Sequence, residues 1–363
     1  MRIFLLADGS SIHTKRWVKG LHHRGYKLFL FSLNKIDSEL DFLENKYSAD
    51  LDFSENKNST LSKLEYLKVF SKLKGLLKEF KPDLIHAHYA SSYGLLCALC
   101  GFKPFVLSVW GSDVFDFPRR SFIHKSILSY NLKKADKILS TSYAMATETK
   151  KYTDNIIEIT PFGIDVNFFK KQKKIRLKEI NSDDLVIGTI KSLERVYGLN
   201  FLIEAFNILL KRGYKNLKLL IVGKGSQLKV LEQMTIDYGI ADQVIFVGWL
   251  PYSKVPSYHN LLDIAVYPSI SESFGVSVIE SGACEVPAVV SNRGGLVEVV
   301  ENDKTGLIAT AENAQSFADN MEVLILDKNK REEMGKEARK RVEKYYNWEE
   351  NLSLMEEIYK SIA

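Results

Sequence analysis

Two glutamates, Glu272 and Glu280, stand eight positions apart in the segment SESFGVSVIE, with Phe-Gly directly after the first. On one helix the second would lie about 80° around the axis from the first, and paired helical side chains are three or four positions apart. The flanking apolar runs DIAVYPS and VSVIESGAC instead predict a strand, a loop and a helix. Glu272 then lies in the loop and Glu280 on the helix, and both face whatever binds over the helix N-terminus.

The chain around these residues alternates short apolar runs with longer amphipathic stretches. RIFLLAD, YKLFLFSL, DLIHAH, FVLSVW and KILSTS come first, and LVIGTI, LKLLIVG, VIFVGWL, IAVYPS and PAVVSN follow the charged stretch KKQKKIRLKEINSDD. Buried strands that alternate with helices predict parallel sheets covered on both faces. We therefore predict an α/β fold of two doubly wound, Rossmann-like domains, residues 1–168 and 169–345. A C-terminal helix over residues 346–363 is expected to pack back on the first domain.

Ligands of such sheets bind outside the carboxyl ends of the strands, so the loops at these ends are expected to line a shared cleft. One wall includes the loops at residues 9–11, 88–92 and 111–113. The other wall includes the loops after GTI, IVG, VGWL and YPS. The charged segment 37–60 is expected to be a surface insertion, and the D-x-D at residues 50–52 within it to be solvated rather than metal-binding.

Several common cofactor motifs are incomplete. IVGKGSQLKVLE supplies Gly223 and Gly225, but Leu228 stands where a dinucleotide-binding fingerprint needs its third glycine, and no Walker A sequence occurs. Cys97 and Cys100 form a C-x-x-C without the two further ligands of a zinc site. We expect buried thiols of a reducing compartment, with no metal and no bound cofactor.

The composition, with 45% apolar and 26% charged residues, is typical of a globular protein. No run of eighteen apolar residues occurs, so no transmembrane helix is expected, and MRIFLLADGSS is interpreted as a strand rather than a signal peptide. The net charge of +5 gathers in HTKRWVKGLHHRGYK, PRRSFIHKSILSYNLKKADK and KKQKKIRLK. No nucleic-acid-binding module accompanies these clusters. We predict a cytoplasmic protein, with peripheral contact to anionic lipids at the inner membrane face as an open alternative to solvated helices.

The region from VIFVGWL to ENDKTGLIA resembles the nucleotide-sugar-binding domain of the retaining family 4 glycosyltransferases, which have the GT-B fold. The residues that carry the resemblance are ESFGVSVIE, an E-x7-E motif, and SGACEVPAVVSNRGGLVEVVENDKTGLI after it. YGLNFLIEAF, LLIVGKG and VIFVGWL precede them in the family's order. LIHAHYASSYG and VWGSDVF are similar to segments of the family's first domain, so the resemblance covers nearly the whole chain.

The resemblance implies that Glu272 accepts hydrogen bonds from hydroxyls of the donor sugar, and that Glu280 accepts from the nucleotide ribose. Carboxylates suit these roles because each oxygen accepts from a diol. A helix N-terminus attracts a diphosphate, and glycine allows close backbone approach. The donor-binding backbone is therefore expected at Ser273, Phe274, Gly275 and Val276.

The chain departs from the family after the first strand of the second domain. The family places an arginine and a lysine there, and Ser192 and Tyr197 occupy these positions. Lys191 and Arg195, in IKSLERVYG, are expected to substitute as the cations that neutralise the diphosphate. The nucleotide base is expected to lie against the segment Gly248, Trp249 and Leu250, in which the tryptophan could equally be a packing residue.

The first domain departs from the family as well. The family's HG.D loop is represented by VWGSDVF, in which Trp110 replaces the histidine and Asp113 remains as the expected catalytic residue. His86 and His88 share one face of a strand, and His88, nearer the strand end, is expected to touch the donor. The diphosphate is also expected to meet the backbone N–H groups of Gly9, Ser10 and Ser11.

These observations predict a retaining glycosyltransferase of the hexosyltransferase type. It would move a sugar from a nucleotide-diphosphate sugar to a saccharide or lipid-linked saccharide, in surface polysaccharide or glycoconjugate synthesis. By resemblance, the reaction is a same-face displacement in which the leaving phosphate helps deprotonate the acceptor, with protein groups positioning the sugar and no metal required. A sugar-nucleotide epimerase of the same fold and a non-catalytic nucleotide-sugar-binding protein remain alternatives. The sequence does not distinguish UDP-, GDP- and ADP-sugars.

Overall fold

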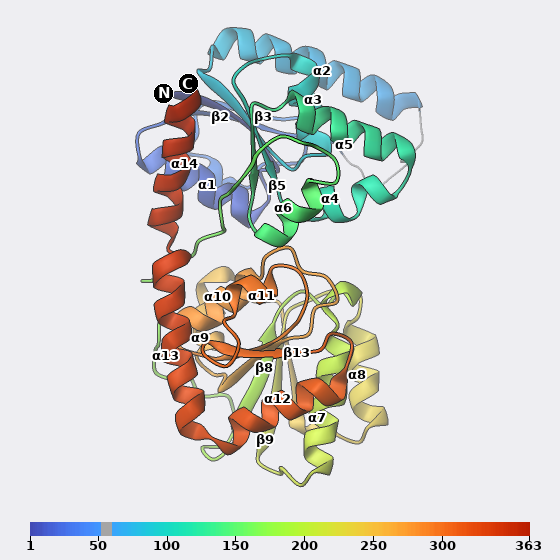
Figure 1. The fold of residues 1–363 in the computed structure, drawn as a ribbon, viewed down its shortest axis with the longest axis vertical. Coiled ribbons are helices and arrows are strands. Elements are labelled where there is room, and N and C mark those ends of the chain that lie inside the picture. Colours follow the sequence, from blue (N-terminus) through green and yellow to red (C-terminus); the bar gives the residue numbers. More distant parts are fainter. Residues whose placement is uncertain (52–59) are drawn as a thin grey trace. The chain divides into compact units, whose positions relative to one another are not determined.

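The structure, a computed structural model, describes residues 1–51 and 60–363, with the backbone alone for residues 60–67. The chain forms two compact units (Figure 1). The first consists of Met1–Thr160 and Leu352–Ala363, and the second of Pro161–Asn351. Each is a parallel sheet with helices on both faces, as predicted from the alternation of apolar and amphipathic runs. No helix in the described part of the chain is long and apolar enough to span a bilayer.

The first unit has a seven-stranded sheet in the order β3-β2-β1-β4-β5-β6-β7, and every neighbouring pair is parallel. All five strands predicted here are present, and the short β3 and β7 were missed. The elements are β1 (Arg2–Leu6), α1 (Ile12–His23), β2 (Lys27–Ser32), η1 (Ser38–Leu40), β3 (Lys46–Ser48), α2 (Thr60–Phe80), β4 (Leu84–His88), α3 (Ser92–Cys100), β5 (Phe105–Val109), α4 (Ser112–Phe115), η2 (Phe117–Arg119), α5 (Phe122–Lys134), β6 (Lys137–Ser140), α6 (Tyr143–Thr149) and β7 (Ile157–Ile159).

The two faces of this sheet carry different side chains because neighbouring strand residues point to opposite sides. Phe4, Ile85 and Leu107 belong to an apolar core that also includes buried residues of α2, α3 and α5, the helices of one face. His86 and His88 alternate with this set and lie on the other face, where Figure 1 shows α1 and α14 (Trp348–Ile362).

Helix α14 completes the first unit through specific polar contacts. The Tyr359 hydroxyl lies 2.6 Å from Nδ1 of buried His86. Arg24, which follows α1, donates to Glu356 at 2.6 Å and to Ser353 at 2.9 Å. Leu352–Ala363 therefore belongs to the first unit although it follows the whole second unit in sequence.

The second unit has a six-stranded parallel sheet in the order β10-β9-β8-β11-β12-β13. All five predicted strands are present, and the four-residue β13 was missed. The elements are β8 (Leu185–Ile190), η3 (Arg195–Tyr197), α7 (Leu199–Lys211), β9 (Leu217–Val222), α8 (Leu228–Asp237), η4 (Ala241–Gln243), β10 (Val244–Gly248), η5 (Tyr252–Lys254), α9 (Val255–His259), β11 (Ile264–Tyr267), α10 (Val276–Ala283), β12 (Ala288–Ser291), α11 (Leu296–Val299), β13 (Gly306–Ala309), α12 (Ala314–Leu326) and α13 (Lys328–Tyr345).

Residues 161–168, predicted to end the first domain, belong to the second unit instead. Ile164 donates from its backbone to Tyr346 at 2.9 Å and forms a bridge with Asn347. Gly163 lies so close to Trp348 that an added Cβ would be 2.8 Å from its Cα. Backbone pairing with a segment far along the chain fixes this boundary, and no local composition change marks it.

The segment 37–60 is not simply a surface insertion. Its Lys46–Ser48 forms β3 and pairs with β2 at the sheet edge. Asp37 caps η1 and, with Glu39, binds Lys15 of α1 at 2.9 and 2.6 Å. Residues 52–59, including Asp52 of the D-x-D, lie outside the described residues.

Candidate functional site

The order of strands in the second unit identifies one place where its loops diverge. Strands β8 and β11 are neighbours, and the chain continues from β8 to β9 on one side and from β11 to β12 on the other. Ligands of open α/β sheets bind at such a switch point, outside the carboxyl ends of the strands. Lys191 directly follows β8, and Glu272 lies in the loop between β11 and α10.

Lys191 and Glu272 meet at this switch point. Nζ of Lys191 lies 2.6 Å from Oε2 of Glu272, and Oγ of Ser269 donates to the same oxygen at 3.3 Å. The two charged side chains are only 13% and 10% exposed. Burial alone would lower the pKa of Lys191, but Glu272 and, more weakly, Glu280 raise it above its ordinary value. The structure thus gathers one cation and both predicted glutamates.

Tyr197 takes part in this cluster at the position where the family has lysine. Nζ of Lys191 lies 4.2 Å from the centroid of its ring, a cation–π distance. Arg195, the second predicted cation, is exposed on η3. Of the two expected substitutes, the structure brings Lys191 to Glu272, and Arg195 stays at the surface.

Helix α10 begins beside Glu272. Gly275 is its N-cap, with φ of 108°, and makes no side-chain cap, so the N-terminal partial charge of the helix remains for a ligand. Phe274 is buried between the rings of Phe162 and Tyr346 and anchors the loop. Ser273 and Val276 flank this pair as predicted.

A glycine pair supports the loop from behind. Gly295 donates its N–H to the carbonyl of Glu272 at 3.0 Å. Gly294 has φ of 52°, and a Cβ there would lie 1.9 Å from the same carbonyl oxygen. A Cβ on Gly295 would lie 2.5 Å from Cα of Phe274. Only glycines fit against this loop, which explains the SNRGG sequence after β12.

Glu280 lies on α10 and is 7% exposed. Oε2 of its carboxylate is 3.5 Å from Nε2 of His259, the last residue of α9. Sequence reasoning missed His259, and nothing in the segment SYHNLLD signals its proximity to Glu280.

The predicted base-binding segment lies at the end of β10, two strands from β8. Trp249 is 64% exposed, and Nζ of Lys224 lies 5.8 Å from its ring. Gly248 accepts a hydrogen bond from the backbone of Gly223 at 2.9 Å, and Leu250 is half-buried. The exposure of Trp249 argues against a packing role for its side chain.

The first strand–helix loop does not offer the N–H groups that we expected. Gly9 donates to Oγ of Ser32 at 3.0 Å, Ser10 donates to the Asp8 carboxylate at 2.9 Å, and Ser11 donates to the Asp8 carbonyl at 3.1 Å. The contact of these amides with the diphosphate stays a prediction, and a bound diphosphate would have to replace these hydrogen bonds.

Asp113, which we expected to be catalytic, accepts backbone hydrogen bonds through its carboxylate in the first unit. It is fully buried, and its carboxylate accepts from the backbone N–H groups of Ala90, Trp110 and Gly111 at 2.6, 3.1 and 2.8 Å. Burial raises the pKa of Asp113, and these hydrogen bonds act in the opposite direction. The carboxylate ties the loop after β5 to the loop after β4.

His88, which we expected to touch the donor sugar nucleotide, is also buried, with 2% exposure. Its ring centroid lies 4.6 Å from that of Trp110 and 4.6 Å from that of His86. Burial holds the pKa of His88 well below its ordinary value, so the ring is neutral. Trp110, which is half-buried, covers His88 at this strand end.

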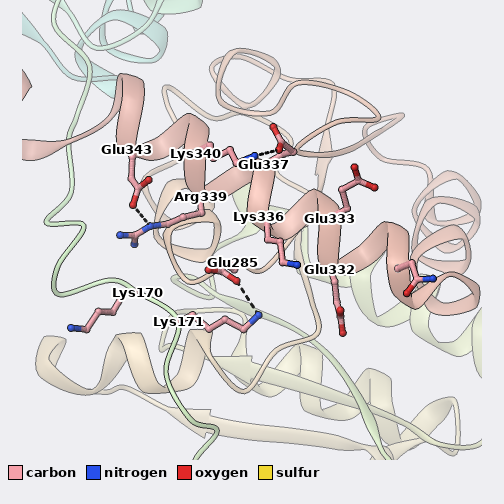
Figure 2. Close-up of a pocket in the computed structure, with 11 residues that line it drawn as sticks. Lys170, Lys171, Glu285, Glu332, Glu333, Lys336, Glu337, Arg339, Lys340 and Glu343 are labelled. Atoms are coloured by element: carbon pink, nitrogen blue, oxygen red, sulfur yellow. Dashed lines mark hydrogen bonds and ion pairs between the residues drawn. The ribbon is translucent and has the colours of Figure 1, made fainter.

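Two cysteines, Cys97 and Cys100, lie on α3 of the first unit, whereas Cys284 follows α10 and donates its backbone N–H to the Glu280 carbonyl at 3.3 Å. Cys97 is buried on α3, and burial raises its thiol pKa. A pocket of about 900 Å³ lies beside α13 and is lined by charged side chains (Figure 2). Its lining includes Glu285, which follows the C-terminal end of α10, whereas Gly275 caps the N-terminal end. Its charges are largely paired, as between Lys171 and Glu285 at 3.0 Å. We therefore place the candidate site at the switch point and not in this pocket.

Comparisons with known proteins show that the chain is similar to glycosyltransferases. Residues 170–341 match the family model "Glycosyl transferases group 1", and residues 2–142 match "Glycosyl transferase 4-like". The capsular polysaccharide biosynthesis glycosyltransferase CapM of Staphylococcus aureus is 31% identical over 69% of this chain, which spans 64% of that protein. An uncharacterized glycosyltransferase of Methanocaldococcus jannaschii, MJ1607, is 28% identical over 98% of this chain and 95% of its own length. The crystal structure of Anabaena HepE in complex with UDP has a TM-score of 0.82 at 18% identity, covering 99% of both chains, and confirms the predicted GT-B fold.

Proposed function

Because the chain belongs to the GT-B glycosyltransferases of the group 1 and 4-like families, we propose that it is a retaining enzyme that transfers a hexose from a nucleotide-diphosphate sugar. The observation that carries the proposal is the pair of Lys191 and Glu272, 2.6 Å apart beside the uncapped N-terminus of α10. A cation and a helix N-terminus suit a diphosphate, and a carboxylate suits sugar hydroxyls.

In the proposed reaction, the bond between the anomeric carbon and the diphosphate breaks while the acceptor hydroxyl forms a bond on the same face of the sugar. The hydroxyl proton passes to the leaving phosphate oxygen. Lys191 and the α10 backbone stabilise the charge that develops on this phosphate, and Glu272 holds the sugar hydroxyls. These groups supply the positive charge, so we expect activity to survive EDTA.

We propose that the donor is a UDP-sugar, since HepE, of the same fold, was crystallised with UDP. Glu280 would accept from the ribose hydroxyls, and the exposed ring of Trp249 would stack on the uracil. Base–aromatic stacking contributes about 1–3 kcal/mol. A Trp249→Ala variant should therefore bind UDP more weakly without losing thermal stability.

The acceptor, we propose, is a saccharide carried on a membrane lipid, as in polysaccharide or glycoconjugate synthesis. Residues 117–135 contain five Lys and Arg residues and no Asp or Glu. At the start of α5, Phe122 and Ile123 are 82% and 67% exposed. Arg119 is paired with Glu148 at 2.9 Å, and the other four basic residues lie with these exposed apolar side chains in the same stretch. Exposed apolar residues among basic side chains suit an anionic lipid surface.

Helix α1 fits this role less well than its sequence suggested. Its Lys15 and Lys19 bind Glu39 at 2.6 Å each, and Lys15 also binds Asp37. Acidic partners within the first unit thus neutralise these charges. The membrane contact is therefore proposed for α5 alone.

Vesicle binding tests this contact. The native chain should bind anionic vesicles at low salt and release them at high salt. Replacing both Phe122 and Ile123 by serine should abolish binding, whereas Leu326→Ser, which removes a 70% exposed apolar side chain from the second unit, should not. Equal binding to neutral and anionic vesicles, or binding to neither, contradicts the proposal.

Nucleotide release from a panel of UDP-, GDP- and ADP-sugars, with and without a lipid-linked saccharide, tests the activity. We expect UDP release from one UDP-sugar, strongly reduced in Glu280→Ala and unchanged in Glu333→Ala, an exposed glutamate of α13. A donor isomerised without nucleotide release identifies an epimerase. Donor binding without any turnover identifies a binding protein.

A further inference from the structure

His259 is a buried histidine with unused hydrogen-bonding capacity behind Glu280. The side chain is fully buried, and its ring packs edge-on against Phe169 with 6.0 Å between centroids. Neither ring nitrogen makes a hydrogen bond. Oε2 of the Glu280 carboxylate lies 3.5 Å from Nε2.

In ligand-free proteins, hydrogen bonds that act in the bound state are often long and tighten when the ligand arrives. Buried polar nitrogens are seldom left unpaired, because leaving one without a partner costs stability. We therefore expect the unpaired ring of His259 to form a hydrogen bond to the Glu280 carboxylate when a ligand is bound.

In the proposed donor site, the carboxylate of Glu280 accepts hydrogen bonds from the ribose, which requires a defined orientation. To accept from two neighbouring ribose hydroxyls it needs one fixed orientation, and a rotating carboxylate would lose part of that interaction. Its position on α10 fixes the side-chain stem but leaves the terminal torsion broad. A hydrogen-bond donor on the buried side of the carboxylate would fix this torsion.

We infer that His259 is a positioning residue for the donor ribose. Its Nε2–H donates to Oε2 of Glu280 when nucleotide is bound and orients the carboxylate toward the two ribose hydroxyls. His259 itself does not touch the nucleotide. This inference rests on the proposed function, and it assigns a ligand-linked task to a residue of α9 that lies outside the E-x7-E segment.

Two amide substitutions separate this role from simple core packing. In the His259→Gln variant, the side-chain nitrogen lies about as far from Cα as Nε2 of histidine. In the His259→Asn variant, it lies about as far from Cα as Nδ1. Both are neutral and polar, so both disturb the apolar surroundings in the same way. Only the glutamine can still donate to Glu280.

The test measures the binding of UDP and of 2′-deoxy-UDP by calorimetry to the full chain and its variants, with the corresponding GDP and ADP pairs in parallel. A hydrogen bond to a charged group corresponds to about ten- to hundredfold in affinity. We expect His259→Asn to lower the affinity for UDP by at least about tenfold and to change the affinity for 2′-deoxy-UDP much less. His259→Gln should retain most of the affinity for UDP.

Other outcomes overturn the inference in distinguishable ways. Equal losses for UDP and 2′-deoxy-UDP, or equal behaviour of the two amides, show that His259 only supports the fold. If neither amide variant melts cooperatively, His259→Phe, which keeps a ring of similar size, takes the place of His259→Asn, and unchanged UDP affinity in it contradicts the inference. A native chain that binds none of the nucleotides refutes the proposed function itself. Native binding that depends on Glu280 but not on His259 refutes the inference alone.

Discussion

Nζ of Lys191 lies 2.6 Å from Oε2 of Glu272, although 81 positions separate the two residues in sequence. The contact exists because β8 and β11 are neighbours in the sheet and both end at the same edge. With side chains only 13% and 10% exposed, each charge is held in place by the other. The cation is therefore already positioned before a donor binds.

Lys191→Met should abolish most of the activity. Loss of one preorganised electrostatic group typically lowers turnover by about 10²- to 10³-fold. The variant should also lower the melting temperature, because Glu272 keeps a partly buried charge without its partner. Combining it with Glu272→Gln should restore part of the stability and none of the turnover, as measured by thermal melting and nucleotide release. Full turnover in Lys191→Met would contradict the assigned role.

Gly294→Ala should disrupt the site through the backbone alone. A residue with a Cβ at φ of 52° is strained by about 1–2 kcal/mol. The added Cβ would also lie 1.9 Å from the Glu272 carbonyl, so the loop must move. We expect lower thermal stability and weaker donor binding. The matched control is Gly75→Ala in α2, where nothing lies within 4 Å and alanine should stabilise the helix by about 1 kcal/mol.

Asp113→Asn tests whether Asp113 holds the two loops together or takes part in catalysis. The asparagine would direct an NH₂ group at backbone donors that now share the two carboxylate oxygens. An unsatisfied buried group costs about 1–3 kcal/mol, so the melting temperature should fall clearly. Asp116→Asn, at an exposed position in the next turn, should be silent. A variant with native stability and lost turnover would instead support a catalytic Asp113.

Acid should destabilise the chain through buried His86. Burial lowers the pKa of His86 from 6.5 to about 3, and its nitrogens contact Tyr359 and Ser108 at 2.6 and 2.8 Å. Between these pH values His86 is protonated in the unfolded chain and neutral in the folded chain. The free energy of unfolding therefore falls as pH drops from about 6.5 toward 3, by about 1.4 kcal/mol per pH unit for each such histidine.

Denaturant titrations from pH 7 to pH 4 measure this slope. His86→Gln keeps a polar group against Tyr359 but cannot take up a proton, so its slope should be smaller than that of the native chain by about one proton. His23→Gln, which changes an exposed histidine at the end of α1, is the matched control and should leave the slope unchanged. Identical slopes in the native chain and His86→Gln would contradict the buried, neutral state.

Much of the fold could be predicted because its signals are local. Apolar runs of four to eight residues identified ten strands, and their alternation with amphipathic stretches predicted the parallel sheets. The strands that were missed, β3, β7 and β13, are three or four residues long and carry little periodicity. The place of Glu272 in a loop before a helix followed from the same local pattern and is confirmed.

The parts that could not be predicted depend on contacts between distant residues. Whether the amides of Gly9, Ser10 and Ser11 are free depends on Asp8 and on Ser32, which comes from the next strand. Asp113 looked catalytic because a sequence shows an acid but not the backbone donors around it. His259 was invisible because α9 approaches α10 only in the folded chain.

Synthesis of the first unit ends only after the whole second unit has been synthesised. Leu352–Ala363 belongs to the first unit but leaves the ribosome only after all of Pro161–Asn351 has been made. Until then His86 and Arg24 have neither Tyr359 nor Glu356 to bind, and the face of the sheet that carries His86 lacks its last helix. The nascent first unit therefore lacks its last helical segment until synthesis ends. A chain truncated before Leu352 would contain every residue of the second unit but not all of the first.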